Sequence, residues 1–250
     1  METYGLIGYP LGHSFSKNFF ADKFSNEQID AEYLNFEIPN IQDITDVLVE
    51  HPTLRGFNVT IPYKQQIIPF LKELSDEARA IGAVNVVKVI RKGNDIKLKG
   101  YNSDVIGFAN SIGPLLQPHH KKALILGTGG ASKAVHYALT EKLGLETCLV
   151  SRTSKPGMMT YSDITPETLR EYEVIVNCSP VGMYPHVDEC PALPYEALNS
   201  SNLLYDLVYN PDQTLFMQKG AAQGAVVKNG LEMLILQAIA SWDFWNGKDE

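Results

Sequence analysis

The segment ALILGTGGASKAVHYALTEKLG, which begins at Ala123, joins an apolar run, a glycine-rich turn and a helical pattern without a break. Three glycines form the turn: Gly127, Gly129 and Gly130. Glycines let the backbone turn tightly and approach a pyrophosphate, and the free N–H groups and dipole of a helix start favour the anion. Ser132 replaces the third glycine of the strict G-x-G-x-x-G pattern, a change that slightly looser helix packing tolerates. The segment predicts a strand–turn–helix unit that binds a dinucleotide.

Two other interpretations of this turn are a glycine-rich turn with no ligand and the glycine loop of an adenosylmethionine-dependent methyltransferase. The next strand, ETCLVSRTSK, separates them. NAD enzymes and such methyltransferases usually carry an acidic residue at its end, which binds the ribose hydroxyls. Here the strand ends in a basic, hydroxyl-rich turn that contains Ser151, Arg152, Thr153 and Lys155. Because an arginine can stack on adenine or bind a 2′-phosphate, the turn indicates NADP, with a solvated surface turn as the alternative.

The rest of the chain alternates short β-rich runs with helical ones, which is typical of α/β proteins with parallel sheets. Before the glycine loop, strands are expected at 3–8, 31–38 and 56–62, helices at 16–27 and 41–51, and an antiparallel hairpin at 83–101 with its turn at Gly93 and Asn94. After it, strands are expected at 146–152, 173–180, 202–209 and 224–227, with a shortened crossover helix between the first two because Pro156, Gly157 and Pro166 interrupt that stretch.

The composition changes at Asn102, and Asp104 can cap a helix that leads into the glycine-loop region. We therefore expect two α/β domains. The first comprises residues 1–102 and is completed by the closing helix 231–250, and the second comprises residues 103–230.

Composition and charge exclude several classes of function. The net charge of -8 argues against a surface that binds nucleic acid phosphates. The amino terminus lacks the pattern of a signal peptide and no apolar run reaches the length of a membrane span, so we expect a cytoplasmic protein without a membrane partner. Cys148, Cys178 and Cys190 show neither disulfide nor zinc spacing, and no metal site is expected. We interpret them as buried thiols.

Eight ordered segments resemble the shikimate dehydrogenase family along nearly the whole chain. They are GYPLGHSFS (8–16), NVTIPYK (58–64), GAVN (82–85), GYNSD (100–104), GTGGA (127–131), NCSPVGM (177–183), YDLVYNP (205–211) and NGLEMLILQ (229–237). The chain departs from the family pattern after the two serines of the first segment, where Lys17, Phe20 and Ala21 replace the usual Pro, His and Asn.

The resemblance implies an N-terminal substrate domain, a Rossmann-type NADP domain and an active site in the cleft between them. It implies reduction of 3-dehydroshikimate to shikimate, with Lys64 and Asp104 as the catalytic pair. A quinate or aminoshikimate-type dehydrogenase of the same fold, and a non-catalytic dinucleotide sensor, stay open as alternatives. The expected partner is a small-molecule substrate, and the chain is expected to be a monomer or a homodimer.

The resemblance also assigns binding residues. Ser14 and Ser16 carry hydroxyls that suit the two oxygens of a carboxylate, although alone they would be interpreted as helix-capping serines. The remaining substrate residues are Asn58, Thr60, Asn85, Tyr209 and Gln237. The cofactor residues are Gly127, Thr128, Gly129, Gly130, Ala131, Ser151, Arg152, Thr153, Lys155, Leu207 and Gly230.

Overall fold

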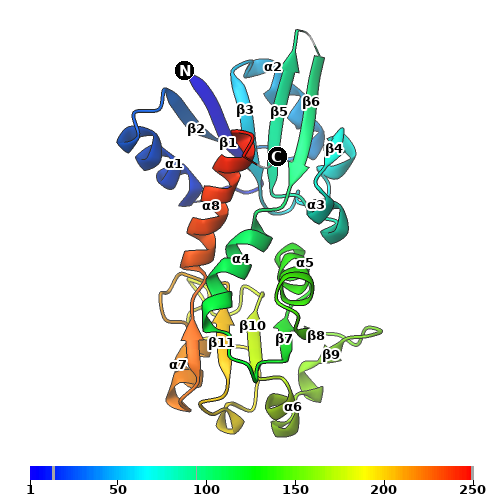
Figure 1. Ribbon diagram of the computed structural model, residues 1–250, viewed down its shortest axis with the longest axis vertical. Helices are drawn as coiled ribbons and strands as arrows, with labels where there is room; N and C mark the ends of the chain where they lie inside the picture. The colour runs from blue at the N-terminus through cyan, green and yellow to red at the C-terminus, as the bar shows by residue number, and fades with distance from the viewer. Residues whose placement is uncertain (13–14, 94, 249–250) are drawn as a thin grey trace. The chain divides into compact units, whose positions relative to one another are not determined.

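The computed structural model describes residues 1–12, 15–93 and 95–248, and the chain divides into two compact α/β units (Figure 1). Unit 1 contains residues 1–103 and 238–250, and unit 2 contains residues 104–237. Two six-stranded sheets, one in each unit, confirm the expected α/β class. No helix within the described ranges is both long and apolar enough to cross a bilayer.

Unit 1 is built on a mixed sheet in the order β2-β1-β3-β5-β6-β4. Its strands are β1 (Glu2–Gly8), β2 (Ala31–Glu37), β3 (Leu54–Val59), β4 (Glu73–Leu74), β5 (Val86–Lys92) and β6 (Asp95–Tyr101). Its helices are α1 (Phe15–Asn26), α2 (Ile44–Glu50), α3 (Asp76–Ile81) and the end of α8 (Leu231–Trp245). The parallel β2-β1-β3 core and the antiparallel β5–β6 hairpin were predicted from the sequence, whereas β4 and α3 were not.

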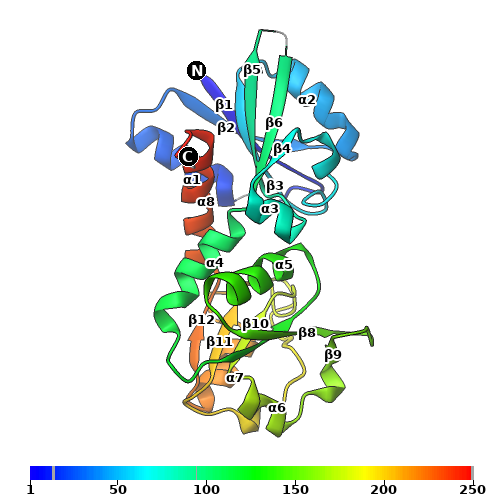
Figure 2. The ribbon, with the colours of Figure 1, turned by 45° about the vertical axis from the view of Figure 1, so that its right-hand side comes forward.

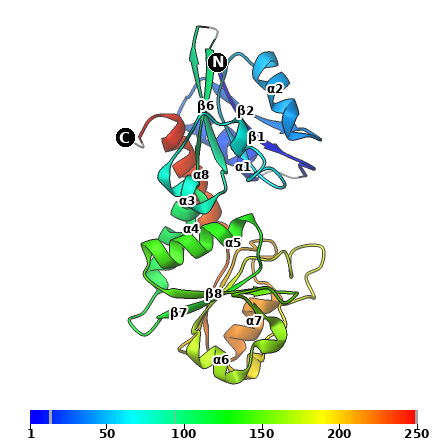
Figure 3. The same ribbon diagram turned by 90° about the vertical axis from the view of Figure 1, so that its right-hand side faces the viewer.

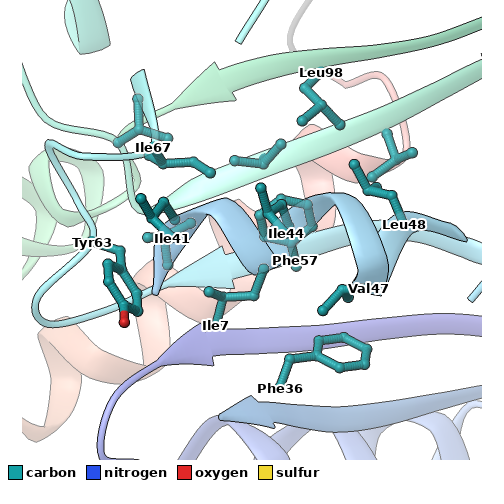
Figure 4. Packing of buried hydrophobic residues seen from close by; sticks show 14 of the residues in the cluster. Ile7, Phe36, Ile41, Ile44, Val47, Leu48, Phe57, Tyr63, Ile67 and Leu98 are labelled. Carbon is teal, nitrogen blue, oxygen red and sulfur yellow. The ribbon is translucent and has the colours of Figure 1, made fainter. Parts of the chain in front are cut away.

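Both faces of the unit 1 sheet are covered. On one face, α2 packs Ile44 against Ile7 of β1 and Phe57 of β3, all completely buried (Figure 4). On the other face, α1 and the end of α8 lie side by side over the strands (Figures 1 and 2). Trp245 of α8 donates from Nε1 to the Val87 carbonyl at 3.0 Å, which ties the end of the chain to the sheet of unit 1.

Unit 2 is an open, fully parallel sheet in the order β12-β11-β10-β7-β8-β9. Its strands are β7 (Lys122–Leu126), β8 (Glu146–Ser151), β9 (Met159–Thr160), β10 (Val174–Asn177), β11 (Leu203–Asp206) and β12 (Val226–Lys228). Its helices are α4 (Asp104–Ile112), α5 (Gly130–Tyr137), α6 (Pro166–Glu171), α7 (Leu215–Ala222) and the start of α8. Helix α5 covers one face of this sheet and α6 and α7 cover the other, as in doubly wound dinucleotide-binding folds (Figure 3).

The crossover between β8 and β10 is short, as the interrupting prolines and glycine predicted. It consists of the two-residue strand β9, a single 3₁₀ turn and the six-residue helix α6, which Thr165 caps by accepting a hydrogen bond from the Thr168 N–H. The three cysteines are unpaired and partly buried, so the expectation of buried thiols holds only in part; burial does raise the pKa of the Cys178 thiol.

Candidate active site

The glycine turn connects β7 to α5 at the carboxyl edge of the unit 2 sheet. Gly127 has φ +121°, and a Cβ there would lie 3.3 Å from the Cys178 backbone, so glycine is required. Gly129 precedes α5, where no side chain caps the helix and a Cβ would meet nothing within 4 Å. Ser132 is buried and donates to the Gly129 carbonyl at 2.6 Å, so its hydroxyl holds the turn together. The helix N–H groups can therefore receive a phosphate.

The basic turn follows β8 at the same edge. Arg152, Thr153 and Lys155 are exposed, whereas Ser151 is buried and accepts a hydrogen bond from the Thr153 N–H at 3.3 Å. Burial raises the pKa of Tyr161, and the positive charge of Arg152 opposes this rise, so the phenol senses the charge of the basic turn. The turn and the glycine loop together fit a dinucleotide that carries an additional phosphate. The sequence did not point to Tyr161, because its place depends on the short crossover.

Two residues expected on the nicotinamide side lie against each other. Leu207 follows β11 and donates its N–H to the Asn177 carbonyl at 2.9 Å. A Cβ on Gly230 would overlap the Leu207 carbonyl, so only glycine allows this close approach. Tyr209, two residues further on, is 39% exposed, which leaves part of its ring available to a ligand.

Asp206, at the end of β11, is a buried acid that sequence reasoning did not select. It accepts hydrogen bonds from Thr214 Oγ1 at 2.6 Å, Asn177 Nδ2 at 2.9 Å and the Val208 N–H at 3.0 Å. Burial raises its pKa to about 6 although these hydrogen bonds lower it. An acid closing the otherwise apolar strand LLYD was the signal that could have identified it.

In unit 1, the segment after β3 is held firmly around Lys64. Tyr63 is buried and donates its hydroxyl to the Ile38 carbonyl at 2.6 Å, and its N–H bonds the Thr60 carbonyl at 2.8 Å. The Lys64 carbonyl accepts from the Val84 N–H at 2.7 Å. The backbone of Lys64 is thus fixed while its side chain stays partly exposed. Thr60 is also partly exposed.

A buried polar network lies beneath this segment. The Tyr33 hydroxyl donates to Asn58 Oδ1 at 2.8 Å. Asn58 Nδ2 donates in turn to Ser241 Oγ at 2.9 Å and to the Asn85 carbonyl at 3.2 Å. Asn85 bonds Ser103 through both ends of its amide, accepting from the N–H at 2.7 Å and donating to Oγ at 3.0 Å. The network joins β2, β3, the start of β5, the approach to α4 and α8.

This network limits how two expected substrate residues can act. Both amide hydrogens of Asn58 are donated within the protein, so a substrate could use only the second lone pair of its Oδ1. Ser16, on α1, hydrogen-bonds the phenol of Tyr33. Burial raises the pKa of Tyr33, and the hydrogen bond with Ser16 opposes this rise. Ser14 lies outside the described residues. The substrate contacts of these side chains stay predictions.

In unit 2, Asp104 is buried and is the first residue of α4. One turn later, Gly107 lets α8 approach closely, since a Cβ there would lie 3.0 Å from the Gln237 nitrogen. Asp104 and Gln237 therefore sit within about one helical turn of the α4–α8 contact. No group of three or more His, Cys, Asp or Glu side chains in the described ranges is arranged to hold a metal ion.

The parallel sheet, the open glycine turn and the basic turn of unit 2 are typical of the nucleotide-binding domain of a dinucleotide-dependent oxidoreductase. Comparison with known proteins gives the family. Residues 6–87 match the model of the shikimate dehydrogenase substrate binding domain. A shikimate dehydrogenase (NADP(+)) from Carboxydothermus hydrogenoformans is 35% identical over 97% of this chain and 91% of its own.

Solved structures agree. Shikimate 5-dehydrogenase from Thermus thermophilus, determined in complex with NADP(H) and shikimate, has a TM-score of 0.85 and 31% identity over 99% of this chain and 94% of its own. A 5-ketofructose reductase of Gluconobacter has a TM-score of 0.83 and 25% identity over 98% of this chain and 93% of its own. The chain belongs to the shikimate dehydrogenase family.

Proposed function

We propose that the chain catalyses the reversible reduction of 3-dehydroshikimate to shikimate with NADPH. The observation that carries the proposal is similarity over nearly the full length to shikimate dehydrogenases, with Lys64 and Asp104 both present in their motifs. Similarity of fold alone would not suffice, since the Gluconobacter protein of the same fold is a 5-ketofructose reductase.

In this proposal residues 103–230 bind NADP. The glycine loop receives the pyrophosphate at the start of α5, and Arg152 with its neighbours binds the 2′-phosphate. The open N-terminus of α5 and the exposed basic side chains support this assignment. When bound, NADPH supplies the hydride. Leu207 and Gly230 then border the nicotinamide.

Residues 1–102 and the closing helix 231–250 form the substrate domain. Ser14 and Ser16 bind the carboxylate, and the ring hydroxyls meet Asn58, Thr60, Asn85, Tyr209 and Gln237. Lys64 stabilises the negative charge that builds on the ketone oxygen as hydride is added, and it delivers the proton. Asp104 hydrogen-bonds the reacting hydroxyl. The fixed backbone of Lys64 supports this role, because a catalytic group must be held in place.

The first experiment measures NADP reduction with shikimate and with quinate. Turnover of shikimate alone supports the proposal, and equal turnover of both acids favours the quinate-type alternative. Binding of NADP without turnover of either would favour a dinucleotide sensor.

The second experiment tests the lysine. General acid–base help is worth ~10²–10⁴-fold, so Lys64→Ala should reduce kcat by about that factor while KM changes only a fewfold. Lys64→Arg should not restore activity, because guanidinium holds its proton too firmly. Asp104→Asn should also lose activity, and its loss should not add to that of Lys64→Ala. A Lys64→Ala variant with normal kcat and raised KM would reduce this lysine to a binding residue.

We also propose that the protein acts in the cytoplasm as a monomer or a homodimer. Three unpaired cysteines are compatible with a reducing compartment. Size-exclusion chromatography with light scattering would determine the oligomeric state.

A further inference from the structure

Asp206 is an ionisable group in an unusual place. It is the last residue of β11 and has no exposed surface. Among the described residues, no lysine, arginine or histidine forms an ion pair with it. Burying a carboxylate without a cation costs free energy, so hydrogen bonds must offset that cost. A buried acid of this kind is a candidate for a functional role.

Three donors from separate segments converge on this carboxylate. Asn177 is the last residue of β10, the Val208 N–H belongs to the segment after β11, and Thr214 is the residue that caps α7. The titratable groups that sense the charge of Asp206 are Cys178 and Tyr195; burial raises the pKa of both, and the negative charge of Asp206 raises it further. Both stay neutral near pH 7, so Asp206 is the one ionised group of this cluster.

The same hydrogen bonds connect two loops at the carboxyl edge of the unit 2 sheet. Besides its bond to Asp206, Asn177 donates to the Val181 carbonyl at 3.3 Å and accepts from Ser179 Oγ at 2.6 Å. Asp206 thereby links residues 177–181 to residues 207–214, the segment that carries Leu207 and Tyr209.

We propose that Asp206 is a positioning residue that holds these two loops in the shape that binds the nicotinamide half of NADP. The inference rests on the proposed function, since it takes this edge of the sheet as the cofactor site. Asp206 acts through Leu207 and its neighbours and need not touch the cofactor.

The ionised form is the one that suits this role. A carboxylate accepts from all three donors, whereas a protonated acid carries an O–H of its own that must point at one of them. The N–H groups of Asn177 and Val208 cannot accept, so this O–H points at Thr214 Oγ1, whose own hydrogen then loses its acceptor. Protonation therefore weakens the bond that ties Asp206 to the residue capping α7. Since burial raises the pKa of Asp206 to about 6, this loss falls within an accessible pH range.

Calorimetric titration of NADP into the wild type and Asp206→Asn gives the direct test. The amide replaces charge-assisted hydrogen bonds with neutral ones and makes the Thr214 hydroxyl an acceptor that loses its own partner, so the dissociation constant for NADP should rise roughly tenfold or more. Asp212→Asn is the matched control, because Asp212 is exposed in the same loop and accepts a hydrogen bond from Asn229. It should bind NADP as the wild type does.

The pH dependence of NADP binding separates positioning from general stability. Wild-type affinity should fall more steeply than that of Asp206→Asn as the pH drops through about 6. Protonation of the NADP 2′-phosphate, with a pKa of about 6, weakens binding to both, so the step due to Asp206 is the difference between them. Thr214→Val removes a hydrogen bond that lowers the pKa of Asp206, so the step should move to higher pH. Thr214→Ser keeps the hydroxyl and should leave the step in place. If Asp206→Asn does not fold, the difference in the pH of this step between Thr214→Val and Thr214→Ser provides the test.

Wild-type affinity in Asp206→Asn, or an unmoved step in Thr214→Val, would overturn the inference even if either variant melted earlier. If shikimate is not oxidised but NADP binding still depends on Asp206 in this way, the proposed reaction fails and the positioning role stands.

Discussion

Tyr33→Phe is a sensitive test of the buried network of unit 1, because it removes one oxygen and little else. Tyr33 is 5% exposed, and its ring stacks on Phe20 with centroids 4.8 Å apart, a contact that phenylalanine retains. The lost hydroxyl is the donor to Asn58 Oδ1, which lies among buried groups. A buried acceptor left unsatisfied costs about 1–3 kcal/mol, so the free energy of unfolding of unit 1 should fall by about 2 kcal/mol.

The assay can be confined to unit 1. Both tryptophans of the chain, Trp242 and Trp245, belong to the aromatic cluster on this unit, so their fluorescence during urea denaturation reports its unfolding. The midpoint should shift without a change in the slope m. Tyr4→Phe is the matched control, since Tyr4 is equally buried but its hydroxyl bonds the exposed Glu2 at 3.1 Å and water can replace it. Equal losses in the two variants would refute the network argument.

Three further predictions concern the cofactor turn, the carboxylate site and the pH dependence of stability. Arg152→Ala should lower the preference for NADP over NAD, measured as a ratio of kcat/KM, by about tenfold or more. An unchanged preference would refute the assignment of Arg152 to the 2′-phosphate. Replacing Ser14 and Ser16 by alanine together should raise the KM for shikimate roughly tenfold with little change in kcat. The carboxyl of Asp206 has a pKa raised from 3.8 to about 6, so the unfolded chain ionises first and unit 2 should lose on the order of 3 kcal/mol as the pH rises from 4 to 6. Comparison of urea midpoints with Asp206→Asn across this range checks it, because that variant has no ionisable group at position 206.

Much of the fold followed from local patterns in the sequence. Apolar runs such as KALIL and VIVN, buried on both sides in a parallel sheet, are recognisable without knowledge of their neighbours. Strand β9, with two residues, and helix α3, with six, were not predicted, because so short a pattern cannot be distinguished from a loop. The shortened crossover was predictable, since proline and glycine act locally.

Candidate site residues could be selected from the sequence where the relevant chemistry is concentrated in one segment, as in the glycine loop and the turn at Arg152. They could not be selected where function depends on pairs of distant residues. Tyr33 and Asn58 are 25 positions apart, and Asn58 and Ser241 are 183 apart, so nothing in the local sequence shows that they bond. The same holds for Asp206 and Asn177, which meet only because β10 and β11 are neighbours.

The candidate residues of each unit share one structural reason for their position. In unit 1, β1 and β3 run parallel, and residues 9–12 and 60–64 follow their carboxyl ends. In unit 2, the glycine loop, the basic turn, Asn177 and Asp206 stand at the carboxyl ends of four parallel strands. Parallel strands bring residues far apart in sequence to one edge, which is where open α/β sheets bind ligands. The hydrogen bonds beneath these edges give partners to polar side chains such as Asn58 and Asp206 that would otherwise be buried unsatisfied, so each sheet can end in polar residues without a large cost in stability.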